Sequence, residues 1–526
     1  MLFVFSVLLF TSVFLTTVSA DENDSKAAQD ITDSAVFTVD QKSFDISKLR
    51  NGSLNDQVAF SHDKELKISS EEPIAAIYIQ FYDFPGTWKA VTESSTYDCG
   101  KNGFLHEFVD LSNNPSNEIT ISFDKDAAIS ELYLFSKGEI PDFVQRWEPS
   151  CDKADLLLLV SHSDDEHLFF AGLLPYYSAI GYKTQVVFFT NHFNYRIRLH
   201  EQLNSLWTAG VKYYPIIGPF PDIYSKGLDN AYNVYKNAGY SENNFLDFEV
   251  EILRRFKPKV VFTHDFNGEY GHGTHMLCAD ILTKAIKAAA DESQFSDSAS
   301  QYGVWDTPKV YFHLYSKNQI KLFFSDIPMD ELGGHTPFYY SQQAYLCNIS
   351  QLPEPSLTKW MCGTENAPVT LASSIGSYSP VTFGLFYTTV GNDTEGKGDP
   401  FENIVSYTEE EKIKEEEQRK QMEEESRRLE SQKSDVESML AENSKELDEL
   451  ERLKNDYESI VKENSTRIER IEAATNGLYI ASVVCFAIFA VMLVILVVTR
   501  RNIKYLKKKT KKINKAGIRT DENNNK

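Results

Sequence analysis

The spacing of apolar residues divides the chain into stretches of different periodicity. Over residues 21–147, apolar and polar positions alternate in runs such as "AAIYIQFYDF" and "ELYLFSKG", and turn clusters such as "NNPSN" separate these runs. β-Branched and aromatic residues in such alternation are typical of strands that bury one face. We therefore predict that residues 21–147 form an antiparallel β-sandwich.

Residues 148–403 follow a second pattern. Short continuous apolar runs, "DLLLLV", "TQVVFFTN" and "KPKVVFTHD", alternate with stretches of helical periodicity such as "RLHEQLNSLWTAG". Strands that are apolar on both faces are typical of a parallel sheet covered by helices on both sides. The pattern predicts a Rossmann-like α/β domain with a parallel sheet over this segment.

The third stretch, residues 404–476, predicts a long helix, because Thr408 to Glu472 contains no Gly or Pro and is dense in Glu, Lys and Arg. From Met422 on, apolar residues recur every seven residues in two rows that lie four residues apart, as the two core positions of a coiled coil do. They are Leu429, Val436, Leu450, Tyr457 and Ile471 in the row of Met422, with Leu440, Leu447, Val461 and Ile468 in the second row. We predict a coiled-coil stalk that joins two chains into a homodimer. Polar residues at other positions of the second row leave a single solvated helix as the alternative.

Both ends of the chain carry targeting signals. Residues 1–20 are apolar and end in Val-Ser-Ala, which predicts a cleaved signal peptide. Residues 477–499 predict a transmembrane helix, since Leu478 to Thr499 carries no charge and is long enough to cross a hydrocarbon core of about 30 Å. The tail at 500–526 is basic, so the positive-inside rule places it in the cytosol. We expect a single-pass type I protein of the plasma membrane or an endomembrane, with everything before the span luminal or extracellular.

Charge and cysteine content narrow the partners further. The chain has a net charge of −23 despite its basic tail, and an acidic ectodomain argues against nucleic acid as a partner. An oxidising compartment permits disulfides, for which Cys347–Cys362 is the preferred pair and Cys99–Cys151 the second, with Cys278 a buried free thiol. Sequons that predict a glycoprotein occur at Asn23, Asn51, Asn348, Asn392 and Asn464.

Two short segments carry candidate chemistry. In "SHSDDEH", directly after an apolar run, His162 and Asp165 are three residues apart, and Asp164 lies beside them. About a hundred residues later, "EYGHGTH" again places two histidines, His272 and His275, three residues apart. Two imidazoles and one carboxylate with an open position suit zinc, and a spare carboxylate beside the bound water suits a general base.

With "RLHE" between them, these segments resemble the LmbE/PIG-L family of zinc-dependent N-acetylglucosaminyl deacetylases. The resemblance implies a Zn²⁺ cofactor, with metal ligands at His162, Asp165 and His275. It also implies catalytic roles for Asp164, as general base, and for His272, which would polarise the acetyl carbonyl.

The same resemblance implies that Arg198 and Tyr270 bind substrate and that Glu166 and Glu201 support the site. Two positions depart from the family pattern. Ser163 replaces a proline, and Thr274 stands where many members carry an aspartate that partners the polarising histidine, so we expect a lower turnover. The remaining histidines nearby are predicted to be structural, with His264 the strongest candidate for an exception; they are His167, His192, His200 and His264.

These observations predict a membrane-anchored deacetylase that removes the N-acetyl group of an N-acetylglucosamine-type sugar in a luminal or extracellular glycan or glycolipid. The alternative, from a different class, is a stalked surface lectin or receptor whose deacetylase domain is weak or inactive and only binds glycans. The β-sandwich suits either function, because such folds often hold carbohydrate, and fold alone does not decide function.

Overall fold

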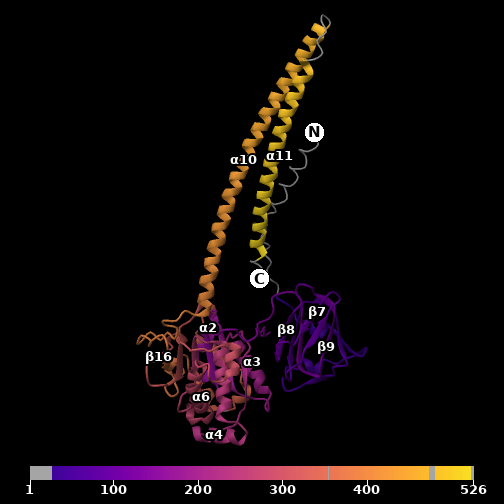
Figure 1. Cartoon of the computed structure of the whole chain (residues 1–526). Helices are drawn as coiled ribbons and strands as arrows, with labels where there is room; N and C mark the ends of the chain where they lie inside the picture. The colour runs from indigo at the N-terminus through magenta and orange to yellow at the C-terminus, as the bar shows by residue number, and fades with distance from the viewer. Residues whose placement is uncertain (1–26, 354, 473–479, 523–526) are drawn as a thin grey trace. The chain divides into compact units, whose positions relative to one another are not determined.

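The computed structural model describes residues 27–353, 355–472 and 480–522 (Figure 1). The predicted signal peptide and the sequon at Asn23 lie outside these residues. The chain divides into two compact units, Met1–Glu409 and Glu410–Lys526. All strands discussed below belong to the first unit.

The N-terminal segment forms two antiparallel sheets. The alternation of apolar and polar residues explains why these strands bury one face. In β4, for example, Leu66 and Ile68 are buried while Lys67 between them is exposed. The sheets pack through aromatic rings, since Phe81 of one sheet lies 6.1 Å from Trp88 and 6.4 Å from Phe123 of the other. The first sheet has the order β2 (Lys42–Ser43), β1 (Val36–Val39), β4 (Glu65–Ile74), β9 (Ser116–Phe123), β6 (Trp88–Val91), β7 (Thr96–Cys99), and the second β3 (Val58–Phe60), β10 (Ala127–Phe135), β5 (Ala76–Phe81), β8 (His106–Asp110). That this segment is a carbohydrate-binding sandwich stays a prediction.

The next segment builds a seven-stranded sheet, which confirms the predicted α/β class. Its order is β13 (Ile216–Pro221), β12 (Thr184–Asn191), β11 (Leu156–Val160), β14 (Val260–Thr263), β15 (Lys309–His313), β19 (Thr382–Thr388), β16 (Gln319–Lys321). The strands from β13 to β15 are parallel, whereas β19 and β16 add an antiparallel edge. The strand order reverses between β11 and β14, and ligands of open α/β sheets bind beyond the carboxyl ends of strands at such a point.

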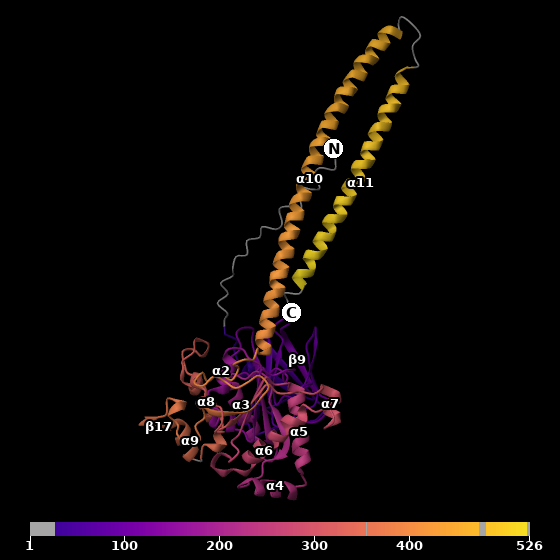
Figure 2. The ribbon, with the colours of Figure 1, turned by 60° about the vertical axis from the view of Figure 1, so that its left-hand side comes forward.

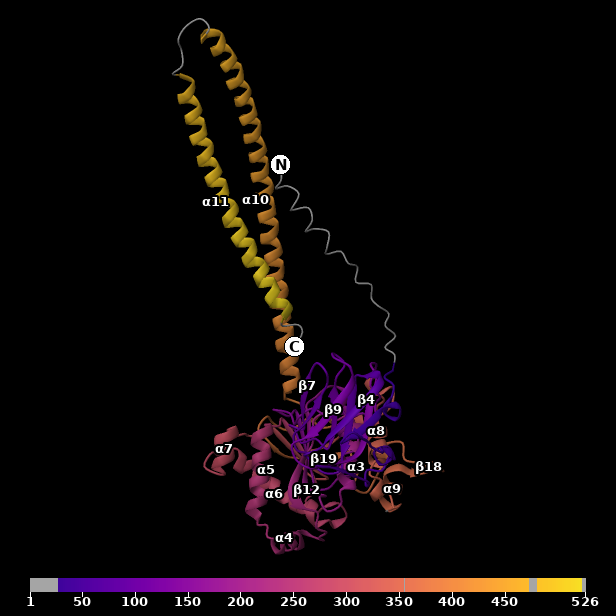
Figure 3. The same cartoon turned by 90° about the vertical axis from the view of Figure 1, so that its right-hand side faces the viewer.

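Helices cover both faces of this sheet (Figure 2 and Figure 3). Alternate residues of β11 enter different cores: Leu156 and Leu158 pack with one set of helices, Leu157 and Leu159 with the other. The first set is α1 (Asp165–Leu168), α2 (Leu173–Ala179), α3 (Ile197–Thr208), α8 (Pro337–Leu346) and α9 (Pro355–Cys362). The second set is α4 (Leu228–Asn237), α5 (Glu242–Phe256), α6 (Gly273–Ala289) and α7 (Ser296–Tyr302).

Two long helices follow. α10 (Tyr407–Glu472) is one continuous helix of 66 residues, in agreement with the absence of Gly and Pro. α11 (Ile480–Glu522) contains the stretch Phe486–Lys508, which is long and apolar enough to cross a membrane. The first residues of the predicted span, 477–479, lie outside the described residues. Pairing of α10 into a coiled coil stays a prediction.

The predicted disulfides and one predicted glycosylation site are wrong. Cys99, Cys151, Cys278, Cys347 and Cys362 are all free thiols, so neither predicted disulfide forms. Cys347 contacts Thr208 of α3, 3.4 Å away, instead of Cys362 at the end of α9. Cys278 is buried, as expected.

The sequon at Asn348 is fully buried. The Asn348 side chain is hydrogen-bonded to Ser163 and to the carbonyl of Tyr345, so it is not accessible for glycosylation in the folded chain.

Candidate active site

The two motifs meet where the strand order reverses. Residues 161–164 leave the carboxyl end of β11 and lead into α1, while the second motif follows β14 through the short helix η3 (Glu269–Gly271) into α6. Asp164 has a φ of 102° and Tyr270 a φ of 48°. Such backbone angles cost non-glycine residues about 1–3 kcal/mol and gather at functional sites. Local strain therefore marks both loops.

Three side-chain atoms form a compact triangle at this point. His162 Nδ1 lies 3.1 Å from Asp165 Oδ2 and 3.2 Å from His275 Nε2, and the last two atoms are 3.3 Å apart. Tetrahedral zinc with bonds of about 2.0–2.2 Å places its ligand atoms about 3.3–3.6 Å apart. The triangle is slightly smaller than this but close to the size that such an ion needs, and its members are the three predicted ligands.

A buried carboxylate stands behind His275. Glu269 Oε2 accepts hydrogen bonds from Nδ1 of His275 (2.6 Å) and of His264 (2.9 Å), and its Oε1 accepts one from His313 Nδ1 (2.6 Å). Burial alone raises the pKa of Glu269, but the charge of His264 and these hydrogen bonds bring it well below the usual range. Because a carboxylate only accepts, His275 carries its proton on Nδ1, which leaves Nε2 free for a metal, as in carboxylate–histidine–zinc arrangements.

His264 is the exception that the sequence analysis anticipated, but it positions other groups. Its Nε2 accepts a hydrogen bond from the backbone N–H of Ser161 at 2.9 Å, and its Nδ1 donates to Glu269. Two other sets also lie close enough to share an ion, Asp165 with His264 and His275, and His162 with His272 and His275. Both ring nitrogens of His264 are used, so the set that contains His264 is the weaker ligand group.

Asp164 lies outside the triangle, next to Arg198. Its carboxylate is buried, and burial raises its pKa, although the nearby Arg198 lowers it in part. Arg198 Nη2 is 3.5 Å from Asp164 Oδ2 and donates to the carbonyl oxygen of Ser163 at 2.5 Å. Glu166 accepts a hydrogen bond from the backbone N–H of Asp164 at 2.9 Å. The predicted base, the predicted arginine and the supporting Glu166 are thus brought together.

Glu201, the second predicted supporting residue, is hydrogen-bonded to Ser350. Its carboxylate accepts hydrogen bonds from the N–H and the hydroxyl of Ser350, at 2.7 and 2.5 Å. Ser163 is also tied to this region, because its hydroxyl donates to Asn348 Oδ1 at 3.0 Å. Where the family pattern has proline, this loop is thus held by a hydrogen bond to a residue far along the chain.

His272 is the N-cap residue of α6, and its ring lies 4.7 Å from that of His162. Among the described residues its buried Nδ1 has no hydrogen-bond partner. Burial, followed by the charges of His162 and His275, lowers the pKa of His272 to about 2. The Thr274 hydroxyl bonds to the carbonyl of Ile223 instead, at 3.5 Å, so the partner that the family pattern supplies is missing here. Tyr270, whose ring is 5.7 Å from His272, is partly exposed beside it.

Two residues outside the predicted set also contact the site. Asp222, directly after β13, lies 3.4 Å from His162 Nε2, 3.4 Å from His192 Nδ1 and 3.5 Å from Arg198 Nη1. His192 Nε2 accepts a hydrogen bond from the N–H of Ser163 at 3.3 Å, so His192 connects the first motif to Asp222. An aspartate after an apolar strand, "IIGPFPD", was the available signal for Asp222. Both histidines of the triangle are therefore backed by carboxylates.

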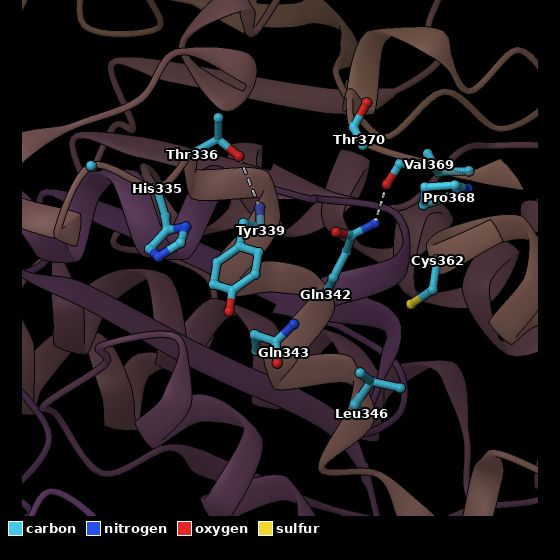
Figure 4. A pocket seen from close by; sticks show the side chains of 11 residues that line it. His335, Thr336, Tyr339, Gln342, Gln343, Leu346, Cys362, Pro368, Val369 and Thr370 are labelled. Carbon is cyan, nitrogen blue, oxygen red and sulfur yellow. Dashed lines mark hydrogen bonds between the residues drawn. The ribbon is translucent and has the colours of Figure 1, made fainter. Parts of the chain in front are cut away.

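The other two histidines have structural contacts, as predicted. His167 lies 3.2 Å from Glu166, and His200 bonds to His106 of the N-terminal segment. A separate pocket of about 440 Å³ lies beside α8 (Figure 4). It is lined by His335, Tyr339, Gln342, Leu346, Cys362 and Val369 among others, and none of the predicted site residues borders it.

The comparison with protein families agrees with this site. Residues 157–286, which include both motifs, match the family model described as "PIG-L: GlcNAc-PI de-N-acetylase". The chain therefore contains a domain of the PIG-L/LmbE family, and the resemblance drawn from the motifs is confirmed.

Similar proteins cover only part of the chain. A protein of Rhodococcus erythropolis named 1D-myo-inositol 2-acetamido-2-deoxy-alpha-D-glucopyranoside deacetylase is 27% identical over 190 residues, which are 32% of this chain and 63% of that protein. A protein of Saccharopolyspora erythraea with the same name, numbered 2, is 29% identical over 27% of this chain and 46% of its own length. The match thus spans less than two thirds of either relative.

Among solved structures, N,N'-diacetylchitobiose deacetylase from Pyrococcus horikoshii is 18% identical, with a TM-score of 0.31, and the match covers 44% of this chain and 84% of that one. The conserved protein TT1542 from Thermus thermophilus is 16% identical, with a TM-score of 0.30, over 45% of this chain and 97% of that one.

Proposed function

We propose that the α/β domain is a zinc-dependent deacetylase that hydrolyses the N-acetyl group of an N-acetylglucosamine-type sugar. The observation that carries the proposal is the triangle of His162, Asp165 and His275. Both histidines are backed by carboxylates, and the carboxylate of Asp164 lies beside the triangle as a candidate general base. The family model and the names of the relatives support the same chemistry.

The residues present fit a zinc ion, which His162, Asp165 and His275 would hold. When bound, zinc lowers the pKa of a water ligand toward about 7 and polarises the carbonyl. Asp164 removes a proton from the attacking water and later delivers a proton to the leaving nitrogen. The water oxygen bonds to the acetyl carbon as the carbon–nitrogen bond breaks, so the products are acetate and a free amino sugar. His272 faces the oxygen that gains negative charge.

The purified ectodomain, residues 21–476, tests this proposal. We expect it to contain close to one zinc per chain, to release acetate from at least one member of a panel of N-acetylated glycans, and to lose that activity with a chelator. Added zinc should restore it. A protein that holds zinc but releases no acetate from any glycan contradicts the enzymatic function.

One observation favours the alternative of a glycan-binding protein without turnover. His272 Nδ1 has no partner among the described residues, and Thr274 does not supply one. In that case the ectodomain should bind N-acetylated glycans and leave their acetyl groups in place. Mass spectrometry of the recovered ligand would detect the intact acetyl group.

We also propose that the domain faces the lumen or the exterior. The apolar start of the chain, the stretch Phe486–Lys508 and the basic tail support this orientation. A tag after Lys526 should be reached by antibody only in permeabilised cells. Protection of that tag inside sealed microsomes contradicts the orientation.

Finally, we infer that α10 pairs with a second copy of itself. Leu440 and Leu447, seven residues apart in the second apolar row of the heptad pattern, are 44% and 47% exposed along the helix. Replacing both with Glu would bury charges in a paired seam, so the variant ectodomain should sediment as a monomer. An unaltered ectodomain that is already monomeric at micromolar concentration contradicts the coiled coil.

A further inference from the structure

The N-terminal sheets contact the α/β domain next to the candidate active site. The loop after β5, residues 82–84, meets the segment that follows β12. Asp83 Oδ1 lies 2.5 Å from Nη1 of Arg196, and the Arg196 guanidinium lies 6.0 Å from the ring centre of Tyr82. The rings of Phe84 and Phe193 meet edge to face, 5.8 Å apart at 84°. An ion pair and an aromatic pair thus fix this loop against the α/β domain.

A short chain of contacts joins this aromatic pair to the metal triangle. Phe193 follows His192 directly, His192 contacts Asp222, and Asp222 lies 3.4 Å from His162. Arg198, two residues after Arg196 on the same segment, contacts both Asp222 and Asp164. The loop of the N-terminal sheets therefore stands beside the residues that surround the proposed reaction.

Exposed aromatic side chains gather at the same edge of the sheet. Phe193, after β12, is 43% exposed, and Tyr224, after the neighbouring β13, is 74% exposed with its ring 5.5 Å from that of His272. Single exposed apolar residues are ordinary, but aromatic residues grouped beside a polar site are typical of a binding surface. Aromatic faces suit the C–H surface of a sugar ring, because a sugar presents an apolar face and a polar edge, as tyrosine and tryptophan themselves do.

We propose that Phe84 and Phe193 form a second sugar subsite, so that the N-terminal sheets select an oligosaccharide over a single sugar. The acetylated sugar that reacts lies at the triangle, and the next sugar of the chain lies on the Phe84–Phe193 pair. This inference rests on the proposed deacetylase function, and it names the class of substrate: a glycan of at least two linked sugars. Asp83 and Arg196 hold the loop in place.

The full-length protein, purified in detergent, tests this subsite with N-acetylglucosamine and its β-1,4-linked trisaccharide. We expect kcat/KM for the trisaccharide to exceed that for the monosaccharide by about tenfold or more, since contacts remote from the reacting bond contribute to transition-state stabilisation. Phe84→Ala and Phe193→Ala should each lower the ratio of the two kcat/KM values by roughly five- to tenfold, the scale for losing one aromatic contact. Phe323→Ala changes a phenylalanine elsewhere that is slightly more exposed, at 52%, and should leave the ratio unchanged.

Direct binding separates this inference from the proposed reaction. If no substrate releases acetate, calorimetric titration with the trisaccharide still decides the subsite, because Phe193→Ala should weaken trisaccharide binding about tenfold while Phe323→Ala should not. Phe193 is partly exposed, so its variant should fold, and a thermal melt checks this. Equal kcat/KM for the two sugars, an unchanged ratio in both variants, or trisaccharide binding that is absent or unaffected by Phe193→Ala overturns the subsite.

Discussion

Two pairs of buried histidines in the first unit have opposite electrostatic surroundings. His162 and His275 lie at the carboxyl edge of the parallel sheet. His106 of β8 and His200 of α3 join the N-terminal sheets to the α/β domain, with 2.8 Å between His106 Nε2 and His200 Nδ1. All four are nearly or completely buried. The first pair is backed by Asp222 and Glu269, whereas His106 bonds to the neutral amide of Gln145 at 2.8 Å.

The pKa values follow these partners. Burial alone lowers the pKa of His162, but the charge of Asp222 and the contact with Asp165 raise it to about 10. Burial lowers the pKa of His106 to about 4, with little compensation from Gln145. Carboxylates that stabilise an imidazolium also stabilise a metal ion in its place, while an amide-bonded pair stays neutral and joins two domains. The neighbours of a buried histidine, more than its burial, indicate its role.

The largest effect should come from the two adjacent aspartates beside the first pair, because the proposed reaction assigns Asp164 and Asp165 different tasks. Asp165→Ala removes a triangle member, so both bound zinc and acetate release should be lost. Asp164→Asn should keep close to one zinc per chain but lose about 10²-fold or more in kcat, the scale for a general base. His272→Ala should resemble Asp164→Asn. Metal analysis and acetate release check all three.

Either of two results breaks this assignment. Equal loss of zinc in the Asp164 and Asp165 variants would make both of them ligands. Normal turnover in Asp164→Asn would remove the base. If the unaltered protein binds no zinc, the motif is a buried hydrogen-bonded turn without a metal, and the histidine pairs differ only in their pKa.

The second prediction concerns the neutral pair. In the unfolded chain His106 takes up a proton near its ordinary pKa of 6.5. In the folded protein its pKa is about 4, so it takes up the proton only near that pH. Between these values the unfolded state holds more protons, so stability is complete above pH 6.5 and falls as the pH drops toward 4. The loss should be about 3 kcal/mol. Denaturant unfolding of the ectodomain at a series of pH values measures it.

A matched variant tests whether this pair is the cause. Replacing both His106 and His200 with Gln should reduce the pH dependence between pH 6.5 and 4 by at least the share of His106, while other buried histidines such as His272 keep a residual slope. His62→Gln removes an exposed histidine of the N-terminal segment and should leave the dependence unchanged. A slope in the double variant as steep as that of the unaltered protein assigns the whole effect to other groups.

The sequence predicted the local part of both regions and missed the part that depends on long-range contacts. The apolar runs before His162 and after Lys257 correctly indicated buried parallel strands, and the two motifs together supplied the three members of the triangle. Asp222 follows a different strand and reaches His162 only in the folded chain. Glu269 lies in the second motif, six residues before His275, but its spacing alone indicated no role. Similarly, the Ser163–Asn348 hydrogen bond joins residues 185 positions apart, and His106 meets His200 across 94. Spacing in the sequence carries no information on which distant residues meet. The predicted disulfides are wrong for the same reason, because a disulfide requires two Cα atoms within about 7 Å and sequence spacing does not give that distance.

The third prediction sharpens the role of the carboxylates. Glu269→Gln keeps the shape of the side chain but removes the charge behind His275. Loss of such a partner typically lowers metal affinity about 10–100-fold, so zinc competition with a chelator should show a shift of that size. Glu107→Gln alters another buried carboxylate, which bonds to Trp88 and Gly100, and should not change zinc affinity. Equal affinity in wild type and Glu269→Gln would show that the carboxylate has only a packing role.

The smallest effect should come from giving His272 the partner that the family pattern supplies. Its Nδ1 has none among the described residues, and its low pKa reflects burial beside other histidines. Thr274→Asp introduces a carboxylate two residues away, which should raise the pKa of His272 and increase kcat roughly three- to tenfold, the worth of about one hydrogen bond. Thr274→Asn has the same size without the charge and should give no increase. Because the Thr274 hydroxyl bonds to the carbonyl of Ile223, both variants lose that contact, and a difference in kcat between them isolates the charge. If both variants lose activity equally, the threonine is needed for packing, and His272 works without a charged partner.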